Sequence, residues 1–315
     1  MTQAVVVSDD RRVTFDWSGD VDGFPVFLLH GTPGSRSGPR PRASVLYRLG
    51  VRLICYDRPG YGESDRHNGR LVADAAWDVL AIADELKLKE FGVVGRSGGG
   101  PHALACAALL GPRPTITAVL VGLAPSDADG LDWHNGMTGS NVTEYELADS
   151  GLEAVEADLK QRAEEIRDDP ETLLKFLNDE LTAPDMRVVS DVPIRRQLHD
   201  TYKEAVRCGA YGWIDDVLAF RRPWGFDLEK IMNPVLLWHG DEDVFSPPSH
   251  THWLAQKIPG AKVDIQRGAA HFDAVRILPK ILAKMKASEG KVNGIVANRS
   301  EGLGVQGAHE AAVSA

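Results

Sequence analysis

One serine of the chain stands among glycines, in the segment GRSGGG at positions 95–100. The apolar run FGVVG leads into it, and the small residues of PHALACAAL follow at helical spacing. A sharp turn between a buried strand and a helix makes the Ser97 side chain project above the sheet, on strained backbone angles. Gly95 and Gly99 stand where a Cβ would collide across this turn, and Gly98 offers its N–H beside the hydroxyl. This pattern predicts that Ser97 is a nucleophile.

A phosphate-binding glycine loop is the main alternative for the same segment. It is disfavoured because no lysine follows as in a P-loop, and no G-x-G-x-x-G opens the first strand–helix unit. The positive end of the helix after Ser97 points to the place where negative charge would develop on a reacting carbonyl.

A serine nucleophile needs a base, which a carboxylate in turn orients. His271, in RGAAHF, follows the last predicted strand, so we expect it at the same edge of the sheet as Ser97. His30, His239 and His102 compete for this role. His30 and His239 end buried strands, which is more typical of structural hydrogen bonding, and His102 lies past the turn at Ser97, on the wrong side of a helical turn. The carboxylate stays open on this reasoning, because WHGDEDVFSP offers Asp241, Glu242 and Asp243, and Asp127 follows another strand.

The elements that position these residues alternate between strands and helices. Short, continuous apolar runs such as FPVFLLHG and VRLICYDRPGYGES end in turn signals, which is typical of strands buried on both faces. We therefore predict an α/β fold with a mostly parallel central sheet, flanked by helices and opened by a hairpin. Its core comprises residues 1–125 and 231–288. Residues 126–230 are acidic and helical in pattern and form an inserted cap, and residues 289–315 form a flexible tail.

Five segments, in this order, resemble the α/β-hydrolase superfamily: HGTPGS, DRPGYGES, GRSGGG, HGDEDVFSP and GAAHF. The resemblance implies the catalytic order Ser97, Asp243, His271, since the family's glycine, two residues and then the acid fall on Gly240 and Asp243. It also implies an oxyanion hole built from the N–H groups of Thr32 and Gly98.

Within the superfamily, HGTPGS and the helical cap look like the proline-iminopeptidase branch. That branch usually has Gly-Gly-Pro-Gly in the oxyanion loop and tryptophan after the nucleophile, whereas this chain has Thr32-Pro33-Gly34 and Gly98. An esterase or similar serine hydrolase of a small molecule is the expected function. The alternatives are an aminopeptidase, a non-hydrolytic use of the triad (C–C cleavage, lyase or perhydrolase chemistry) and, last, a binding module without catalysis.

Specificity is expected to come from the cap. Trp133, Trp213 and Trp224 are possible walls of an apolar pocket, and Arg96 could meet an acidic group of the substrate. Each also has a plain alternative: the tryptophans as the core of the cap, and the arginine as a solvated or paired side chain.

The composition disfavours some classes of binding partner. A net charge of −10 over 315 residues disfavours nucleic acid and anionic membranes. Three separated cysteines form neither a disulfide framework nor a metal-ligand pattern, and the N-terminus carries no signal-peptide pattern. We expect a cytoplasmic protein that acts on a small molecule with no cofactor and no metal.

Overall fold

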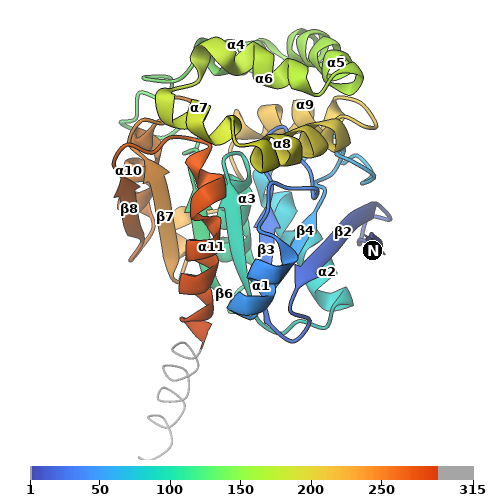
Figure 1. Ribbon diagram of the computed structural model, residues 1–315, viewed down its shortest axis with the longest axis vertical. Coiled ribbons are helices and arrows are strands. Elements are labelled where there is room, and N and C mark those ends of the chain that lie inside the picture. The colour runs from blue at the N-terminus through green and yellow to red at the C-terminus, as the bar shows by residue number, and fades with distance from the viewer. Residues whose placement is uncertain (1, 290–315) are drawn as a thin grey trace, which may run out of the picture.

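The computed structural model describes residues 2–289, and its centre is one eight-stranded sheet in the order β1-β2-β4-β3-β5-β6-β7-β8 (Figure 1). The strands are β1 (Gln3–Val6), β2 (Arg12–Gly19), β3 (Phe24–Leu29), β4 (Val51–Tyr56), β5 (Phe91–Arg96), β6 (Pro114–Leu120), β7 (Val235–Gly240) and β8 (Lys262–Gln266). β1 and β2 form the predicted hairpin and pair antiparallel, while β3 to β8 are parallel to one another. The predicted α/β class is confirmed.

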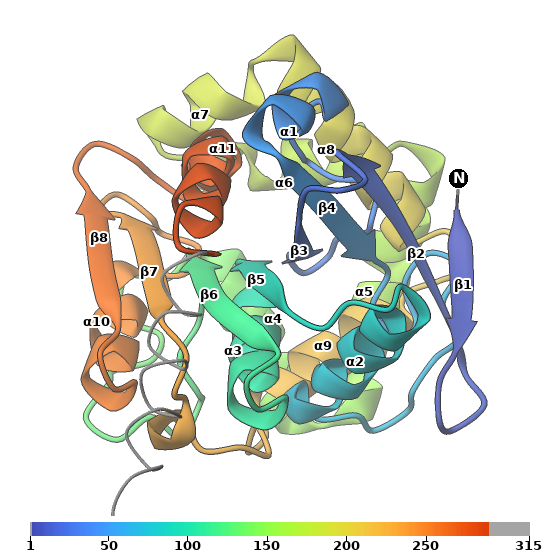
Figure 2. The same cartoon turned by 90° about the horizontal axis from the view of Figure 1, so that it is seen from below.

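Successive residues of the central strands point to opposite faces, and helices cover both. In β3, Val26 and Leu28 pack in one cluster with helix α11 (Asp273–Lys286). Phe27 and Leu29 pack in another cluster with α2 (Ala75–Glu85) and α3 (Gly99–Leu109). Figure 2 shows α1 (Ala43–Leu49) and α11 on one face and α2 and α3 on the other. Because both faces are covered, the strands are continuous apolar runs in the sequence.

In the described part of the chain, five helices flank the sheet: α1 (Ala43–Leu49), α2 (Ala75–Glu85), α3 (Gly99–Leu109), α10 (Pro248–Lys257) and α11 (Asp273–Lys286). Six more follow one another between β6 and β7: α4 (Gly139–Ser150), α5 (Leu152–Asp168), α6 (Glu171–Leu177), α7 (Ala183–Val189), α8 (Val192–Ala205) and α9 (Tyr211–Phe220). Short 3₁₀ turns lie at Val72–Asp74, Asn178–Glu180 and Leu228–Lys230.

The six consecutive helices α4–α9, here called the cap, lie across one end of the sheet (Figure 1). This is the end where the parallel strands have their carboxyl termini, so the loops that follow β3, β5, β7 and β8 open toward the cap. The predicted flexible tail falls, from residue 290 on, outside the described residues.

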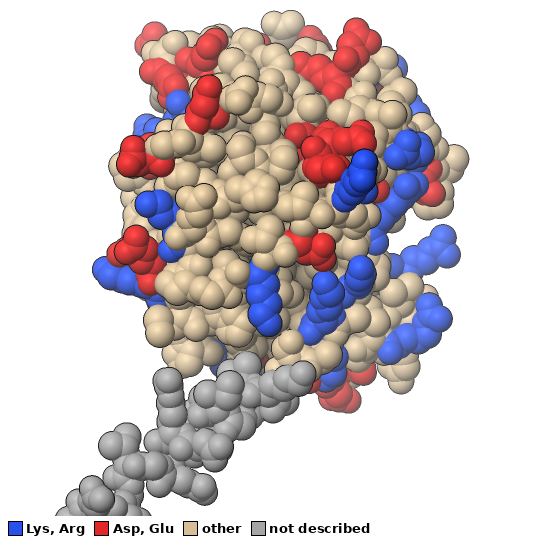
Figure 3. Space-filling view, turned by 90° about the vertical axis from the view of Figure 1, so that its left-hand side faces the viewer, with Lys and Arg blue, Asp and Glu red and all other residues tan. Residues whose placement is uncertain are grey.

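Charged side chains of both signs are spread over the face shown in Figure 3, with acidic groups more frequent toward the cap. Two of the three arginines in the segment 35–42 are paired: Arg40 with Asp16, and Arg36 with Asp57 and Glu204. Among residues 2–289, no helix combines the length and apolar character needed to cross a membrane.

Candidate active site

Ser97 lies between β5 and α3 with a φ of +52°, in the left-handed region that a serine rarely adopts. The neighbouring glycines make this turn possible. A Cβ on Gly95 would lie 2.2 Å from the carbonyl oxygen of Gly99, and one on Gly99 would lie 2.2 Å from that of Leu29. The strained serine and the close backbone contacts have the geometry expected for a nucleophile at a strand-to-helix turn.

His271 and Asp243 lie on the loops that follow β8 and β7. Asp243 Oδ2 is 2.9 Å from His271 Nδ1, and its Oδ1 accepts hydrogen bonds from the backbone N–H groups of Phe245 and Ser246. Gly240 allows the two loops to meet, since a Cβ there would lie 2.3 Å from the carbonyl oxygen of Ala269. Because a carboxylate can only accept, Nδ1 of His271 carries the proton, and Nε2 is the nitrogen available as a base.

The other acids that the sequence left open lie elsewhere. Asp241 accepts a hydrogen bond from the N–H of Gly268, so its carboxylate closes the loop between β8 and His271. Asp127 is exposed at the surface after β6. Of these candidates, Asp243 is the one that contacts His271.

The three competing histidines are buried and hydrogen-bonded. His30 Nε2 accepts from the backbone N–H of Arg58, and His102 Nδ1 lies 2.8 Å from the carbonyl oxygen of Gly98. His239 Nε2 lies 2.5 Å from the carbonyl oxygen of Ser246 and 3.1 Å from Asp243 Oδ2, so this imidazole supports the acid.

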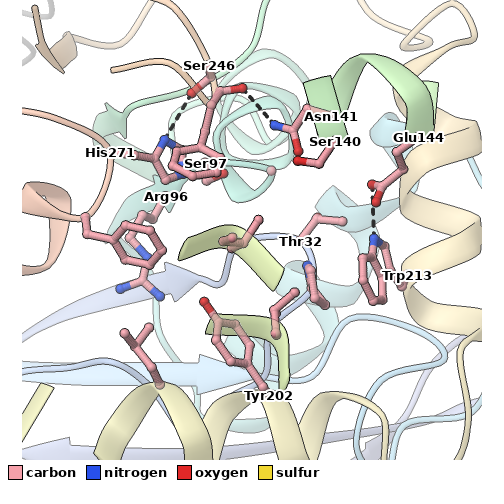
Figure 4. Close-up of a pocket in the computed structure, with 18 of the residues that line it drawn as sticks. Thr32, Arg96, Ser97, Ser140, Asn141, Glu144, Tyr202, Trp213, Ser246 and His271 are labelled. Carbon is pink, nitrogen blue, oxygen red and sulfur yellow. Dashed lines mark hydrogen bonds between the residues drawn. The ribbon is translucent and has the colours of Figure 1, made fainter. Parts of the chain in front are cut away.

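Ser97 and His271 line one cavity of about 110 Å³ beneath the cap (Figure 4). Within residues 2–289, no direct hydrogen bond joins the Ser97 hydroxyl to the imidazole in this structure. Contacts between a nucleophile and its base are often long without substrate and tighten when substrate binds. Thr32, Gly98 and Arg96 line the same cavity.

The loop after β3 packs directly against Ser97. A Cβ on Gly31 would lie 3.9 Å from Ser97 Oγ, and a Cβ on Gly98 would lie 2.3 Å from Thr32 Oγ1. The two backbone segments predicted to supply the oxyanion hole are therefore neighbours, and the Thr32 side chain fills the space where residue 98 would carry a side chain.

A buried ionic network, which the sequence did not reveal, fixes this loop. Asp216 of the cap helix α9 is fully buried and accepts from Arg58, Arg70, Tyr61 and the hydroxyl of Thr32. The guanidinium of Arg58 also donates to the carbonyl oxygens of His30 and Gly31. Arg58 is thus a structural residue with no exposure to the cavity, and Asp216 connects the cap to the loop after β3.

Comparison with known proteins identifies the architecture. Residues 25–275 match the family model of the alpha/beta hydrolase fold. The chain belongs to the alpha/beta hydrolase family. The chain is 27% identical to a 2-hydroxymuconate semialdehyde hydrolase of Pseudomonas putida over 81% of its length and 83% of the relative's. A proline iminopeptidase of Arabidopsis thaliana is 31% identical, over 40% of this chain and 34% of the relative.

A solved esterase from Exiguobacterium antarcticum shares the fold of this alpha/beta hydrolase. It superposes with a TM-score of 0.67 at 22% identity, over 93% of this chain and all of that one. The low identity means that this likeness concerns the fold alone.

The pocket of this alpha/beta hydrolase differs from the sequence-based expectation at two of the three tryptophans. Trp213 lines the cavity, with its Nε1–H donating to Glu144 Oε1 at 3.1 Å. Trp133 and Trp224 do not belong to the lining. Trp133 is buried against Tyr145 and donates to the carbonyl oxygen of Ala124, and Trp224 is buried with its ring stacked on Phe226. Both belong to the packed core under the cap, which was the plain alternative for these residues.

His271 and Asp243 each shift the pKa of the other. Burial alone would raise the pKa of Asp243, but the charges and hydrogen bonds of His271 and His239 outweigh it and hold that pKa below its usual value. For His271 burial lowers the pKa, whereas Asp243 and then Asp185 raise it, and the net pKa lies above 6.5. The base form of His271 is therefore lost as the pH falls through a value above 6.5.

Asp185, on the cap helix α7, is expected to tune this titration. It is fully buried and accepts from the backbone N–H of Phe272 at 2.7 Å, and burial raises its own pKa to about 6, so it is mostly ionised at neutral pH. Asp185→Asn keeps an acceptor but removes the charge, which lowers the pKa of His271. The acid limb of kcat/KM should shift to lower pH by about 0.3–1 units.

The measurement is the pH profile of kcat/KM from pH 5 to 9 on a neutral ester. Asp264→Asn, at a half-exposed aspartate of β8 paired with Lys284, is the control and should leave the profile in place. If the acid limb of the kcat/KM profile stays at the same pH in Asp185→Asn, or shifts to higher pH, the result would contradict the assignment of His271 as the titrating base.

Proposed function

We propose that this chain is a serine hydrolase that cleaves an ester, amide or related acyl bond of a small molecule. The observation that carries the proposal is the hydrogen bond between Asp243 and His271, with the imidazole on the same cavity as the strained Ser97. Acyl transfer to water requires an oriented base beside a nucleophilic hydroxyl, together with hydrogen-bond donors for the developing oxyanion.

In the proposed reaction, Ser97 Oγ attacks the carbonyl carbon while His271 Nε2 takes its proton. Asp243 holds the imidazole in the required tautomer and stabilises the imidazolium. The N–H groups of Thr32 and Gly98 hold the negative oxygen of the tetrahedral intermediate, and each such donor contributes about 10²–10³ in rate. His271 then protonates the leaving group. Water then attacks the acyl-enzyme while His271 Nε2 takes one of its protons. The bond between the acyl carbon and Ser97 Oγ breaks, and His271 returns the proton to this oxygen.

The size of the cavity supports a small substrate. Its volume of about 110 Å³ is below the roughly 150 Å³ of an engineered cavity that holds benzene, so the cavity as it stands holds a small acyl or leaving group, and a larger ester requires movement of the cap. The match to the aminopeptidase is partial, and Gly98 with Thr32 departs from that branch, so we place ester hydrolysis before peptide hydrolysis.

A fluorophosphonate probe followed by intact-mass measurement tests the proposal. Wild-type protein should gain the mass of one adduct, and Ser97→Ala should gain none. Ser140→Ala is the matched control, because Ser140 lines the same cavity but its hydroxyl is bonded to Glu180, and this variant should label like the wild type. Labelling that survives in Ser97→Ala, or no labelling of the wild type, would refute the proposed nucleophile.

A panel of 4-nitrophenyl esters and aminoacyl anilides then separates the two hydrolase classes. We expect Ser97-dependent turnover of short-chain esters and at most weak turnover of the anilides. The reverse preference would make aminopeptidase activity the better description.

A further inference from the structure

Two arginines line the cavity, and they differ in their partners. Arg162 lies 2.9 Å from Asp158 and 3.8 Å from Glu144, so its charge is compensated within the cap. Arg96 immediately precedes Ser97 and, among residues 2–289, forms no salt bridge. The one side-chain hydrogen bond that Arg96 forms with the described residues donates to the carbonyl oxygen of Pro39 at 3.2 Å. A guanidinium has five N–H donors, so most of its hydrogen-bonding capacity is left for a ligand.

Tyr202 and Cys55, the acidic groups that interact with Arg96, are neutral, and the imidazole of His271 also interacts with Arg96. Burial raises the pKa of Tyr202 to about 12 and that of Cys55 to about 11, so the phenol and the thiol keep their protons at neutral pH. The acid of the cavity, Glu144, lies across it from Arg96 and is bonded to Trp213 (Figure 4). The same view shows the hydroxyl of Tyr202, from helix α8, on the side of the cavity where Arg96 lies. An unpaired cation in a partly buried site is costly, and a ligand anion removes that cost.

We propose that Arg96, with the hydroxyl of Tyr202 as a second donor, binds a carboxylate of the substrate. This inference rests on the proposed function and adds the substrate class, namely acyl compounds that carry a carboxylate apart from the scissile bond. One cation and one neutral donor match the single charge of a carboxylate. They match a phosphate less well, because a phosphate monoester carries about two charges at neutral pH.

The first experiment compares kcat/KM for paired esters of equal length: 4-nitrophenyl hydrogen esters of glutaric, adipic and pimelic acid, and the same compounds with the distal carboxylate methylated. The wild type should prefer a charged member by about tenfold or more. In Arg96→Gln this preference should fall by about 10- to 100-fold, the range expected for a hydrogen bond between charged groups. Arg96→Lys should restore part of it. Arg162→Gln is the matched control, and its preference should change by less than about threefold.

A substitution at Arg96 could displace the neighbouring Ser97 and lower kcat/KM for both esters of a pair. Because this loss is common to both esters, it cancels in the ratio of their kcat/KM values. A wild-type ratio near one for all three lengths, an equal fall for both members of the pair, or a larger effect of Arg162→Gln would overturn the assignment of Arg96.

A binding measurement keeps this inference distinct from the proposed reaction. Calorimetry with the three free dicarboxylates on Ser97→Ala should show binding that is weakened at least tenfold when Arg96→Gln is added. If that dependence holds but no ester is turned over through Ser97, the hydrolase proposal fails and the carboxylate site stands. If Ser97-dependent ester hydrolysis holds without any Arg96-dependent binding or preference, the carboxylate site fails alone.

Discussion

Ser97→Ala and His271→Ala are each expected to lower kcat for ester hydrolysis by about 10⁵-fold or more, and the double variant should lose little beyond either single variant. The reason is that a serine hydroxyl without a base, or a base without the hydroxyl, leaves only the contribution of the oxyanion hole and of binding. Asp243→Asn should cost about 10⁴-fold, because an amide at this position can donate to Nδ1 and thereby favour the wrong tautomer.

The measurement is single-turnover and steady-state kinetics on one activated ester, with a thermal-unfolding scan of each variant. The surface variant Asp264→Asn serves as the kinetic control. Losses that add between Ser97→Ala and His271→Ala would mean that the two groups act independently, and a loss below about 100-fold in either would remove it from the reaction. A hydrolytic rate that persists in all three variants would point to a contaminating enzyme or a different nucleophile.

The second large effect concerns stability. Asp216→Ala is expected to lower the free energy of unfolding by about 3–5 kcal/mol, since it leaves the buried guanidinium groups of Arg58 and Arg70 without their shared carboxylate. Asp216→Asn keeps the shape and should still be strongly destabilising, because the two positive charges stay uncompensated.

Chemical denaturation at neutral pH provides the measurement. Asp84→Ala, which removes an exposed partner of Arg113, is the control and should cost less than about 1 kcal/mol. Burial would raise the pKa of Asp216, but Arg58 and Arg70 outweigh it and hold the pKa well below 3.8. The advantage of the wild type over Asp216→Asn should therefore be complete above pH 3.8 and be lost only as the pH falls below it. An Asp216→Ala protein as stable as Asp84→Ala would show that the network contributes little.

The local part of this molecule could be predicted from the sequence because local rules govern it. The turn at Ser97 can be predicted because glycines lie within two residues of it, at positions where a Cβ would collide with the backbone. The buried strands can be predicted from their apolar runs. The positions of His271 and Asp243 after parallel strands place them at one edge. The structure brings these two together, and His271 lines the same cavity as Ser97.

The contacts between the cap and the core could not be predicted in the same way. The contact of Arg58 with Asp216 joins residues 158 positions apart, and neither strand alternation nor a family motif specifies it. One signal was present: helix α9 carries two adjacent aspartates within the otherwise apolar YGWIDDVLAF, and buried acids require buried cations. The tryptophans were ambiguous because an aromatic side chain is equally suited to a pocket wall and to a core, and only packing decides between them.

The bonding of Asp216 has a consequence for engineering and for divergence among relatives. A chimera that takes helices α4–α9 from a homologue without this carboxylate would leave Arg58 and Arg70 without their acidic partner. It would also loosen the loop after β3, which this network holds in place. The cap can therefore be exchanged only when the new cap has an aspartate at position 216 to pair with Arg58 and Arg70. New substrate preferences should be easier to select by point changes on α4, α6 and α8 than by wholesale replacement.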